Sequence, residues 1–185
     1  MNVWQGDKIR LRAVELSDVD NYFCKKEFYD SEDERKGDKL ILPRSRELMV
    51  DRVTSLAKQD PYGDECFLII EDLEGNPVGN INTHSVSVTD GVFSYGLGVK
   101  KCYTNNGYAT EAIKILLQFY FMERGFHKVE VEVFAFNEAS IALHEKFGFV
   151  LEGTLRENHY TMGKWHDALC YGLLKDEFMD KYTLS

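Results

Sequence analysis

A long helical pattern between two strand-like segments is the feature that most restricts the fold of this chain. Between residues 108 and 124 the apolar side chains recur at spacings of three and four, as on one buried helix face, and Gly125 is placed to end the helix. Residues 92–99 before the helix and 129–133 after it have the pattern of strands. A strand, helix, strand order predicts a crossover connection, and with it a locally parallel or splayed strand pair.

The remaining elements predict a mixed sheet in which most strand pairs are antiparallel. Two turns, Glu74-Gly75-Asn76 and Thr89-Asp90-Gly91, join neighbouring strands into a meander. The expected elements are strands at 9–12, 66–70, 78–88, 150–160 and 168–174, helices at 17–27, 46–58 and 138–147, and a loop with a short helical turn at 28–45. The fold class is therefore α/β (α+β), with helices flanking the sheet, in a single domain over residues 1–185.

Charge and cysteine spacing exclude several function classes. The net charge of −9 argues against nucleic-acid binding, which needs a basic surface, and favours a cationic partner such as an amine. The four cysteines show no C-x-x-C spacing, so neither a metal site nor a disulfide framework is indicated. No apolar run is long enough to cross a bilayer, so we expect a cytoplasmic protein that binds no membrane.

The segment CYTNNGYATEA, residues 102–112, has two interpretations. As an anion site, it brings a tight loop to a helix start, where the first amides have no partner and carry partial positive charge. Gly107 would remove side-chain bulk there, and Asn105 and Asn106 tolerate left-handed backbone angles. As a plain turn, the same segment is only a loop capped by asparagine. These residues alone leave both interpretations open.

A second polar group lies at the helix predicted for residues 138–147. Asn137 is placed to cap this helix, and Ser140 and His144 follow at spacings of three and four, so the three side chains share one face. A polar row of this kind also occurs on ordinary surface helices. Because the two polar segments follow consecutive strands, both can face one cleft.

Three segments in register resemble the GNAT superfamily of acetyl-CoA-dependent N-acetyltransferases, within its Rim-type (ribosomal-protein-alanine) and polyamine acetyltransferase branch. They read YGLGVKKCYTNNGYATEA, NEASIALHEKFGF and LEGTLRENHY, and the resemblance covers residues 9–178. It implies the GNAT fold, a mixed and mostly antiparallel sheet with a splayed central strand pair flanked by helices. It also implies acetyl-CoA as cosubstrate and no metal.

The resemblance implies a coenzyme A site at the start of the central helix. The family's pyrophosphate pattern, Q/R-x-x-G-x-G/A, falls here on Thr104, Asn105, Asn106, Gly107, Tyr108 and Ala109. The backbone amide near Val99 would contact the thioester carbonyl, and Asn137 and Ser140 belong to the same cofactor set. Thr104 departs from the family's Gln or Arg. This departure weakens the expected charge contact but leaves the backbone donors in place.

The resemblance also implies two catalytic residues. Acetyl transfer to an amine needs a base for the amine and an acid for the departing thiolate. Similar Rim-type enzymes place a glutamate five residues before the asparagine and a tyrosine seven after it, which here are Glu132 and His144. Glu132 equally fits a solvent-facing strand position, and His144, which replaces the tyrosine, could still donate a proton as an imidazolium. His84 or a water molecule is the alternative base.

The predicted function is transfer of the acetyl group from acetyl-CoA to a primary amine within a ternary complex. The acceptor is either a protein N-terminal amine or a small polyamine, and the sequence does not decide between them. A non-catalytic acyl-CoA-binding sensor of the same fold is the alternative, because Thr104 and His144 depart from the family pattern. A nucleotide-phosphate binder is a third interpretation, and a homodimer is left open.

Overall fold

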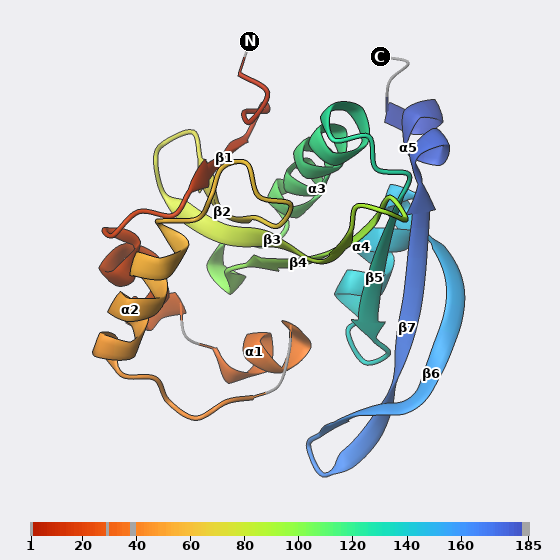
Figure 1. Cartoon of the computed structure of the whole chain (residues 1–185). Coiled ribbons are helices and arrows are strands. Elements are labelled where there is room, and N and C mark those ends of the chain that lie inside the picture. Colours follow the sequence, from red (N-terminus) through yellow and green to blue (C-terminus); the bar gives the residue numbers. More distant parts are fainter. Residues whose placement is uncertain (1, 29, 38–39, 183–185) are drawn as a thin grey trace. The chain divides into compact units, whose positions relative to one another are not determined.

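The computed structural model describes residues 2–28, 30–37 and 40–182. Its elements in chain order are β1 (Ile9–Ala13), η1 (Val19–Phe23), η2 (Lys26–Phe28), α1 (Ser31–Gly37), α2 (Arg46–Leu56), β2 (Phe67–Asp72), β3 (Pro77–Ser87), β4 (Val92–Val99), η3 (Lys101–Tyr103), α3 (Tyr108–Gln118), η4 (Phe119–Glu123), β5 (Lys128–Phe134), α4 (Glu138–Phe147), β6 (Val150–Thr161), β7 (Lys164–Leu174) and α5 (Lys175–Tyr182) (Figure 1). Of the short elements, η1 and η4 are single π-helical turns, and η2 and η3 are 3₁₀ turns.

Seven strands form one mixed sheet in the order β1-β2-β3-β4-β5-β7-β6. β4 and β5, the strands joined through α3, are parallel, whereas the pairs β1–β2, β2–β3, β5–β7 and β6–β7 are antiparallel. The parallel pairing covers only residues 92–94 of β4 and 128–130 of β5, although both strands continue beyond it. The predicted fold class and the crossover through the central helix are therefore confirmed.

The structure divides into two compact units. The first comprises the chain up to Thr83 together with residues 96–119, and the second comprises residues 84–95 and the chain from Tyr120 onward. Strands β3 and β4 each contribute residues to both units. The single domain expected over residues 1–185 stays a prediction.

The first unit has one core around η1, η2, α2, β2 and the residue that follows β1. A cluster of buried apolar side chains joins these elements: Val14, Val19, Tyr22, Phe28, Val53 and Ile69. Helix α3 packs against β1 and buries the apolar face predicted from its spacing, with Ala112, Ile113, Leu116 and Leu117 fully covered. Burial of this face fixes the start of α3 relative to β1.

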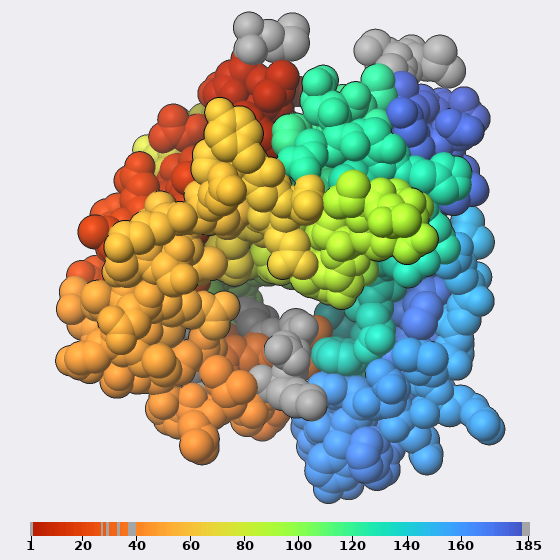
Figure 2. All heavy atoms as spheres, in the orientation of Figure 1, coloured from red at the N-terminus to blue at the C-terminus, as the bar shows by residue number. Residues whose placement is uncertain are grey.

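The second unit is held together by aromatic packing. Phe93 of β4 stacks on Tyr120 with ring centroids 4.3 Å apart, and Phe147 of α4 stacks on Tyr182 of α5 at 4.6 Å. At its edge, β6 and β7 form a hairpin (Figure 1) that turns at Met162 and Gly163. In the space-filling view the blue atoms of this part of the chain lie at the surface, at the bottom of the picture (Figure 2). The tip of this hairpin is exposed. It includes Tyr160 and Trp165, whose ring centroids lie 5.1 Å apart.

The helix expected at residues 17–27 is wrong in form. The chain makes one π-helical turn, η1, in which the Cys24 amide bonds the Val19 carbonyl at 2.8 Å, and then the 3₁₀ turn η2. Asp18 lies at the start of the expected helix, where its side chain could cap it, but the carboxylate accepts hydrogen bonds from Arg12 and from the Glu15 amide. The side chain that would have capped an α-helix is therefore engaged elsewhere.

Other boundaries differ by smaller amounts. Residues 28–45, expected to be a loop with a short helical turn, contain helix α1, and residues 29, 38 and 39 of that range lie outside the described residues. Helix α3 ends at Gln118 and the chain continues as the π turn η4, so the long helical pattern is only partly α-helical. Strand β7 begins at Lys164, and α5 was not predicted.

Candidate functional site

The loop before α3 adopts the backbone that an anion cradle requires. Gly107, the residue that precedes the helix, has a φ of 82°, and Asn105 has a φ of 65°, both in the left-handed region. Asn105 is one of the few non-glycine residues that take this conformation in the described chain. The two left-handed residues bend the chain sharply into the first turn of α3.

The amides of this loop have no protein partner. In the described chain, the N–H groups of residues 105–110 donate no hydrogen bond to a protein acceptor, and the first amide of α3 that does so is Glu111, to the Gly107 carbonyl at 3.1 Å. Free amides at a helix start carry partial positive charge and are available to an anion. A diphosphate therefore fits the donors that the loop presents.

Polar side chains of the loop stabilise its shape. The Thr104 hydroxyl donates to the Lys101 carbonyl at 2.9 Å, and the Asn106 amide group donates to the carbonyls of Tyr103 and Thr104 at 3.1 and 3.3 Å. These bonds hold the loop in place, and the side chains add no charge to it. The weakened charge contact expected from Thr104 stays a prediction.

Val99 is the last residue of β4 and lies in the first unit. The neighbouring strand β3 lies close to this end of β4. A Cβ at Gly79 of β3 would clash with the Gly98 carbonyl and would stand 3.2 Å from the Val99 Cα. Glycine at position 79 therefore permits the backbones of β3 and β4 to lie this close. The contact of the Val99 amide with a thioester stays a prediction.

In the second unit, the predicted row of Asn137, Ser140 and His144 is present on α4. The Asn137 side chain caps the helix by accepting a hydrogen bond from the Ser140 amide at 3.3 Å. The His144 ring lies 3.3 Å from the Ser140 hydroxyl, and its Nδ1 lies 2.7 Å from the Ser140 carbonyl. The structure therefore brings these three side chains together, while their cofactor role stays a prediction.

His144 is buried and both of its ring nitrogens are engaged. The residue is 5% exposed, and its Nε2 atom lies 2.9 Å from the Tyr95 hydroxyl. The Ser140 carbonyl can only accept, so we assign the proton to Nδ1, and Nε2 then accepts from Tyr95. Burial lowers the pKa of His144 below its ordinary value, and burial also raises the pKa of Tyr95.

This arrangement differs from the imidazolium on which the predicted acid role depended. A neutral ring with its proton on Nδ1 has no proton on Nε2 to donate. Tyr95 comes from β4, 49 positions before His144, so no local pattern in the sequence indicated the pair. The phenol that the family carries on the helix is absent at position 144, but a phenol from β4 contacts that position.

The burial of His144 predicts a pH dependence of stability. The pKa of His144 is lower in the folded protein than the ordinary value of 6.5, which we take for the unfolded chain. Below pH 6.5 the unfolded chain therefore binds more protons than the folded one. The contribution of His144 to stability is present above pH 6.5 and is lost as the pH falls. Below pH 6.5 the free energy of unfolding should fall more steeply in the wild type than in His144→Gln, by up to about 1.4 kcal/mol per pH unit. Urea unfolding between pH 5 and 8 measures both curves, and parallel curves would contradict a buried neutral His144.

Glu132 lies on an exposed position of β5, as the solvent-facing interpretation expected. Its carboxylate accepts a hydrogen bond from the Asn158 side chain at 3.2 Å. Glu130 and Glu152 lie nearby in the second unit, where Lys128 bonds both at 2.8 Å. The exposed carboxylates form an acidic region on β5 and β6. His84, the alternative base, is also exposed, and its ring contacts Ser85 at 3.3 Å.

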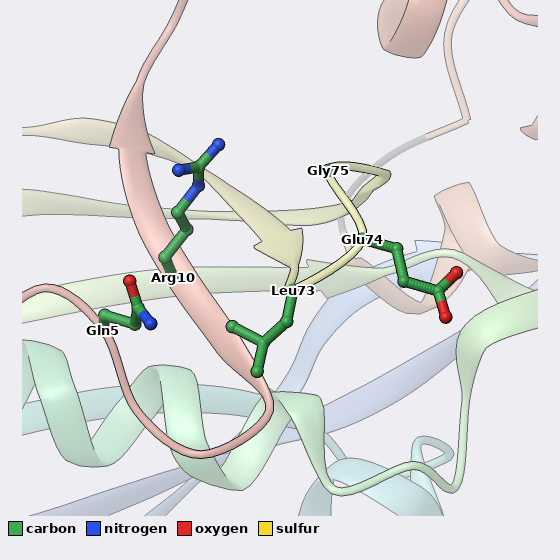
Figure 3. Close-up of a pocket in the computed structure, with 5 residues that line it drawn as sticks. All are labelled: Gln5, Arg10, Leu73, Glu74 and Gly75. Atoms are coloured by element: carbon green, nitrogen blue, oxygen red, sulfur yellow. The ribbon is translucent and has the colours of Figure 1, made fainter.

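Two surface cavities lie apart from the predicted site residues. One of about 330 Å³ in the first unit lies between β1 and the turn that joins β2 to β3 (Figure 3), and it is lined by Gln5, Arg10, Leu73, Glu74 and Gly75. The Glu74 side chain points away from Arg10 in this view, and Arg10 is paired with Glu71. The other, about 680 Å³, is lined by Thr154, Leu155, Arg156, Glu157 and Asp167 of the β6–β7 hairpin. Neither offers the amide cradle found before α3.

Two other features are absent from the residues that the structure describes. In the part of the chain that the structure describes, no three or more histidine, cysteine, aspartate or glutamate side chains are grouped to hold a metal ion. Among the helices described, none has the length and apolar character needed to cross a membrane.

Comparison with known proteins identifies the family. The family model described as "Acetyltransferase (GNAT) domain" matches residues 8–150. The chain is 35% identical over 175 residues to the SPbeta prophage-derived uncharacterized N-acetyltransferase YokL of Bacillus subtilis (strain 168), covering 95% of this chain and 94% of that protein. A solved structure of a probable acetyltransferase has a TM-score of 0.82 at 24% identity, with 95% of this chain and 97% of that chain covered.

A second solved structure holds ligands. It is spermidine N-acetyltransferase from Vibrio cholerae in complex with CoA and spermine, with a TM-score of 0.78, 19% identity, and coverage of 92% of this chain and 98% of that one. At this identity the likeness supports the fold alone. Taken with the family match over most of the chain, the left-handed loop and the free amides before α3, these findings establish that the chain belongs to the GNAT family of acetyl-CoA-dependent acyltransferases.

Proposed function

We propose that this protein transfers the acetyl group of acetyl-CoA to a primary amine of the polyamine type, by direct transfer in a ternary complex. The observation that carries the proposal is the set of unbonded amides over residues 105–110 at a left-handed glycine. Such donors suit the diphosphate of coenzyme A, and the GNAT family uses that cosubstrate. Within the first unit, the proposed cofactor contacts are Val99 and Thr104 to Ala109. The cofactor role expected for Asn137 and Ser140, which lie in the second unit, stays a separate prediction.

The acidic region of the second unit supports a cationic acceptor. Glu130, Glu132 and Glu152 place carboxylates on β5 and β6, and Lys128 compensates part of this charge. A protonated amine is attracted to such a region. We assign Glu132 as the base, because an exposed carboxylate can take the ammonium proton directly or through water, so that a neutral nitrogen can attack the thioester.

The acid role of His144 requires a change of protonation. In the neutral ring Nε2 accepts from Tyr95, so it can donate only after Nε2 is protonated. Nε2–H would then donate to the Tyr95 oxygen, and the Tyr95 hydroxyl would be released to protonate a thiolate. We therefore assign the acid to the Tyr95 and His144 pair. His144 first takes one proton from water at Nε2, the phenol then gives its proton to the thiolate, and the Nε2 proton moves to the phenolate, so that both groups end neutral and coenzyme A leaves as the thiol.

Three other interpretations of the site are tested by the same experiment. The Rim-type resemblance favours a protein N-terminal amine as acceptor, and the departures at Thr104 and His144 favour a sensor that binds acyl-CoA without turnover. The nucleotide interpretation predicts binding of ATP that coenzyme A does not displace. Each of the three therefore makes a different prediction from acetyl transfer to a polyamine.

The test measures thiol release from acetyl-CoA with spermidine, spermine, monoamines and short peptides with free N-termini. We expect turnover with the polyamines, and competition between coenzyme A and any bound ATP. His144→Phe should lower turnover by about 100-fold without changing coenzyme A affinity, and Glu132→Gln should lower it more than the control Glu130→Gln on the same strand. Binding without turnover on any amine would favour the sensor, and turnover on peptides alone would favour the N-terminal amine.

A further inference from the structure

We propose that Lys8 supplies the positive charge for the coenzyme A diphosphate that Thr104 does not supply. This inference rests on the proposed function, because it adds a residue to the same cofactor site. Thr104 occupies the position where the family pattern has Gln or Arg, and its hydroxyl is already bonded to the Lys101 carbonyl. Lys8 lies 96 positions earlier in the sequence. No local motif therefore connects it with the loop.

The Lys8 ammonium lies directly beside the cradle, within the first unit. Its Nζ donates to the Asn106 carbonyl at 2.9 Å, and a Cβ built at Gly107 would stand 3.1 Å from the same nitrogen. The ammonium is thus adjacent to the left-handed residue whose neighbours have unbonded amides. An ammonium has three N–H donors, so two remain for phosphate oxygens after the bond to Asn106.

The backbone on both sides of Lys8 is held by one carboxylate of α3. Glu111 accepts hydrogen bonds from the amides of Asp7, Lys8 and Ile9 at 2.7, 2.9 and 3.0 Å. A side chain at Gly6 would clash with this carboxylate, so glycine is needed for the segment to lie against it. The three amide bonds also compensate the Glu111 charge, which would otherwise oppose an anion near the helix start.

The anchoring continues on either side of this contact. Ile9 begins β1 and is fully buried, and the Trp4 ring packs on Phe119 at the end of α3 with centroids 4.7 Å apart. The segment that carries Lys8 is therefore attached to both ends of the helix whose start forms the cradle. Because the backbone is fixed before any ligand binds, ordering the lysine costs less than it would on a free chain end.

Lys8→Met tests the role. We expect the dissociation constant of coenzyme A, measured by isothermal titration calorimetry at low salt, to rise about tenfold. The salt dependence of binding should also weaken, because one ionic contact is lost. Lys58→Met, at an exposed lysine beyond the end of α2 in the same unit, is the matched control and should leave affinity unchanged.

A second variant separates charge from loop structure. Lys8→Met combined with Thr104→Arg restores the family's cation within the loop and should recover most of the lost affinity, whereas a lysine that only closes the loop would not be replaced in this way. Unchanged affinity in Lys8→Met, or no recovery with Thr104→Arg, would overturn the inference while the proposed function stands. A wild-type protein that binds no coenzyme A would overturn both.

Discussion

Gly107→Val is expected to weaken acetyl-CoA binding by at least about 100-fold, because it removes access to two or more amide donors, each worth about 1.5–3 kcal/mol to a charged acceptor. The branched side chain would stand over the amides that precede α3, where a diphosphate must approach the backbone. It would also meet the Lys8 ammonium, which lies 3.1 Å from the position of a Cβ. Calorimetric titration with acetyl-CoA measures the change.

The left-handed backbone of Gly107 makes a control necessary, because valine is strained at a φ of 82° whatever the ligand. Gly75→Val in the same unit provides it: this glycine has a φ of 88°, and a Cβ there would meet nothing within 4 Å. Both variants should lose stability, but only Gly107→Val should lose affinity. Equal affinity in the two variants would remove the loop from the cofactor site.

Arg12→Met should lower the free energy of unfolding by about 3–5 kcal/mol, because it leaves the buried Asp18 carboxylate without its cation and removes one of the two cations that pair with the buried Glu71. The Arg12 guanidinium bonds both oxygens of Asp18 at 2.8 Å and also bonds Glu71. Asp18 is 1% exposed and Glu71 is 4% exposed. The hydrogen bond to Asp18, with that to Glu71, raises the pKa of Arg12, so it remains charged at any working pH. Urea unfolding measures the difference.

Arg46→Met is the matched control for this prediction. Arg46 also forms a two-point pair with an aspartate of the same unit, Asp20, at 2.7 and 2.9 Å, but both side chains are more than half exposed. Exposed pairs contribute little because solvent screens them and both side chains lose freedom. We expect little or no change in stability. A loss in Arg46→Met as large as that in Arg12→Met would show that burial does not decide the effect.

Features that depend on neighbouring residues could be predicted from the sequence. The spacing of apolar residues in α3 predicted its buried face, the turns at Gly75 and Gly91 predicted the meander, and the strand, helix, strand order predicted the parallel pair. The loop before α3 was predicted to tolerate left-handed angles, and Asn105 and Gly107 have them. Each of these properties is set within a few residues of the chain.

Features that depend on distant contacts could not be predicted in this way. His144 was expected either to donate a proton as an imidazolium or to lie on a helix surface without a role, but Tyr95 bonds its ring and Phe149 packs on it, so that it is buried. The helix expected from residue 17 fails because Arg12 binds the carboxylate of Asp18. Lys8 lies beside Asn106 because Glu111 holds its segment. In each case a partner from another element decides the role of the residue.

A crystal structure of the full chain with coenzyme A tests the account most directly. The amides before α3 are predicted to bond the diphosphate oxygens at about 2.7–3.2 Å, with the Lys8 ammonium on the same group. Coenzyme A bound elsewhere, or a diphosphate that these amides do not contact, would contradict the cofactor site and every role derived from it.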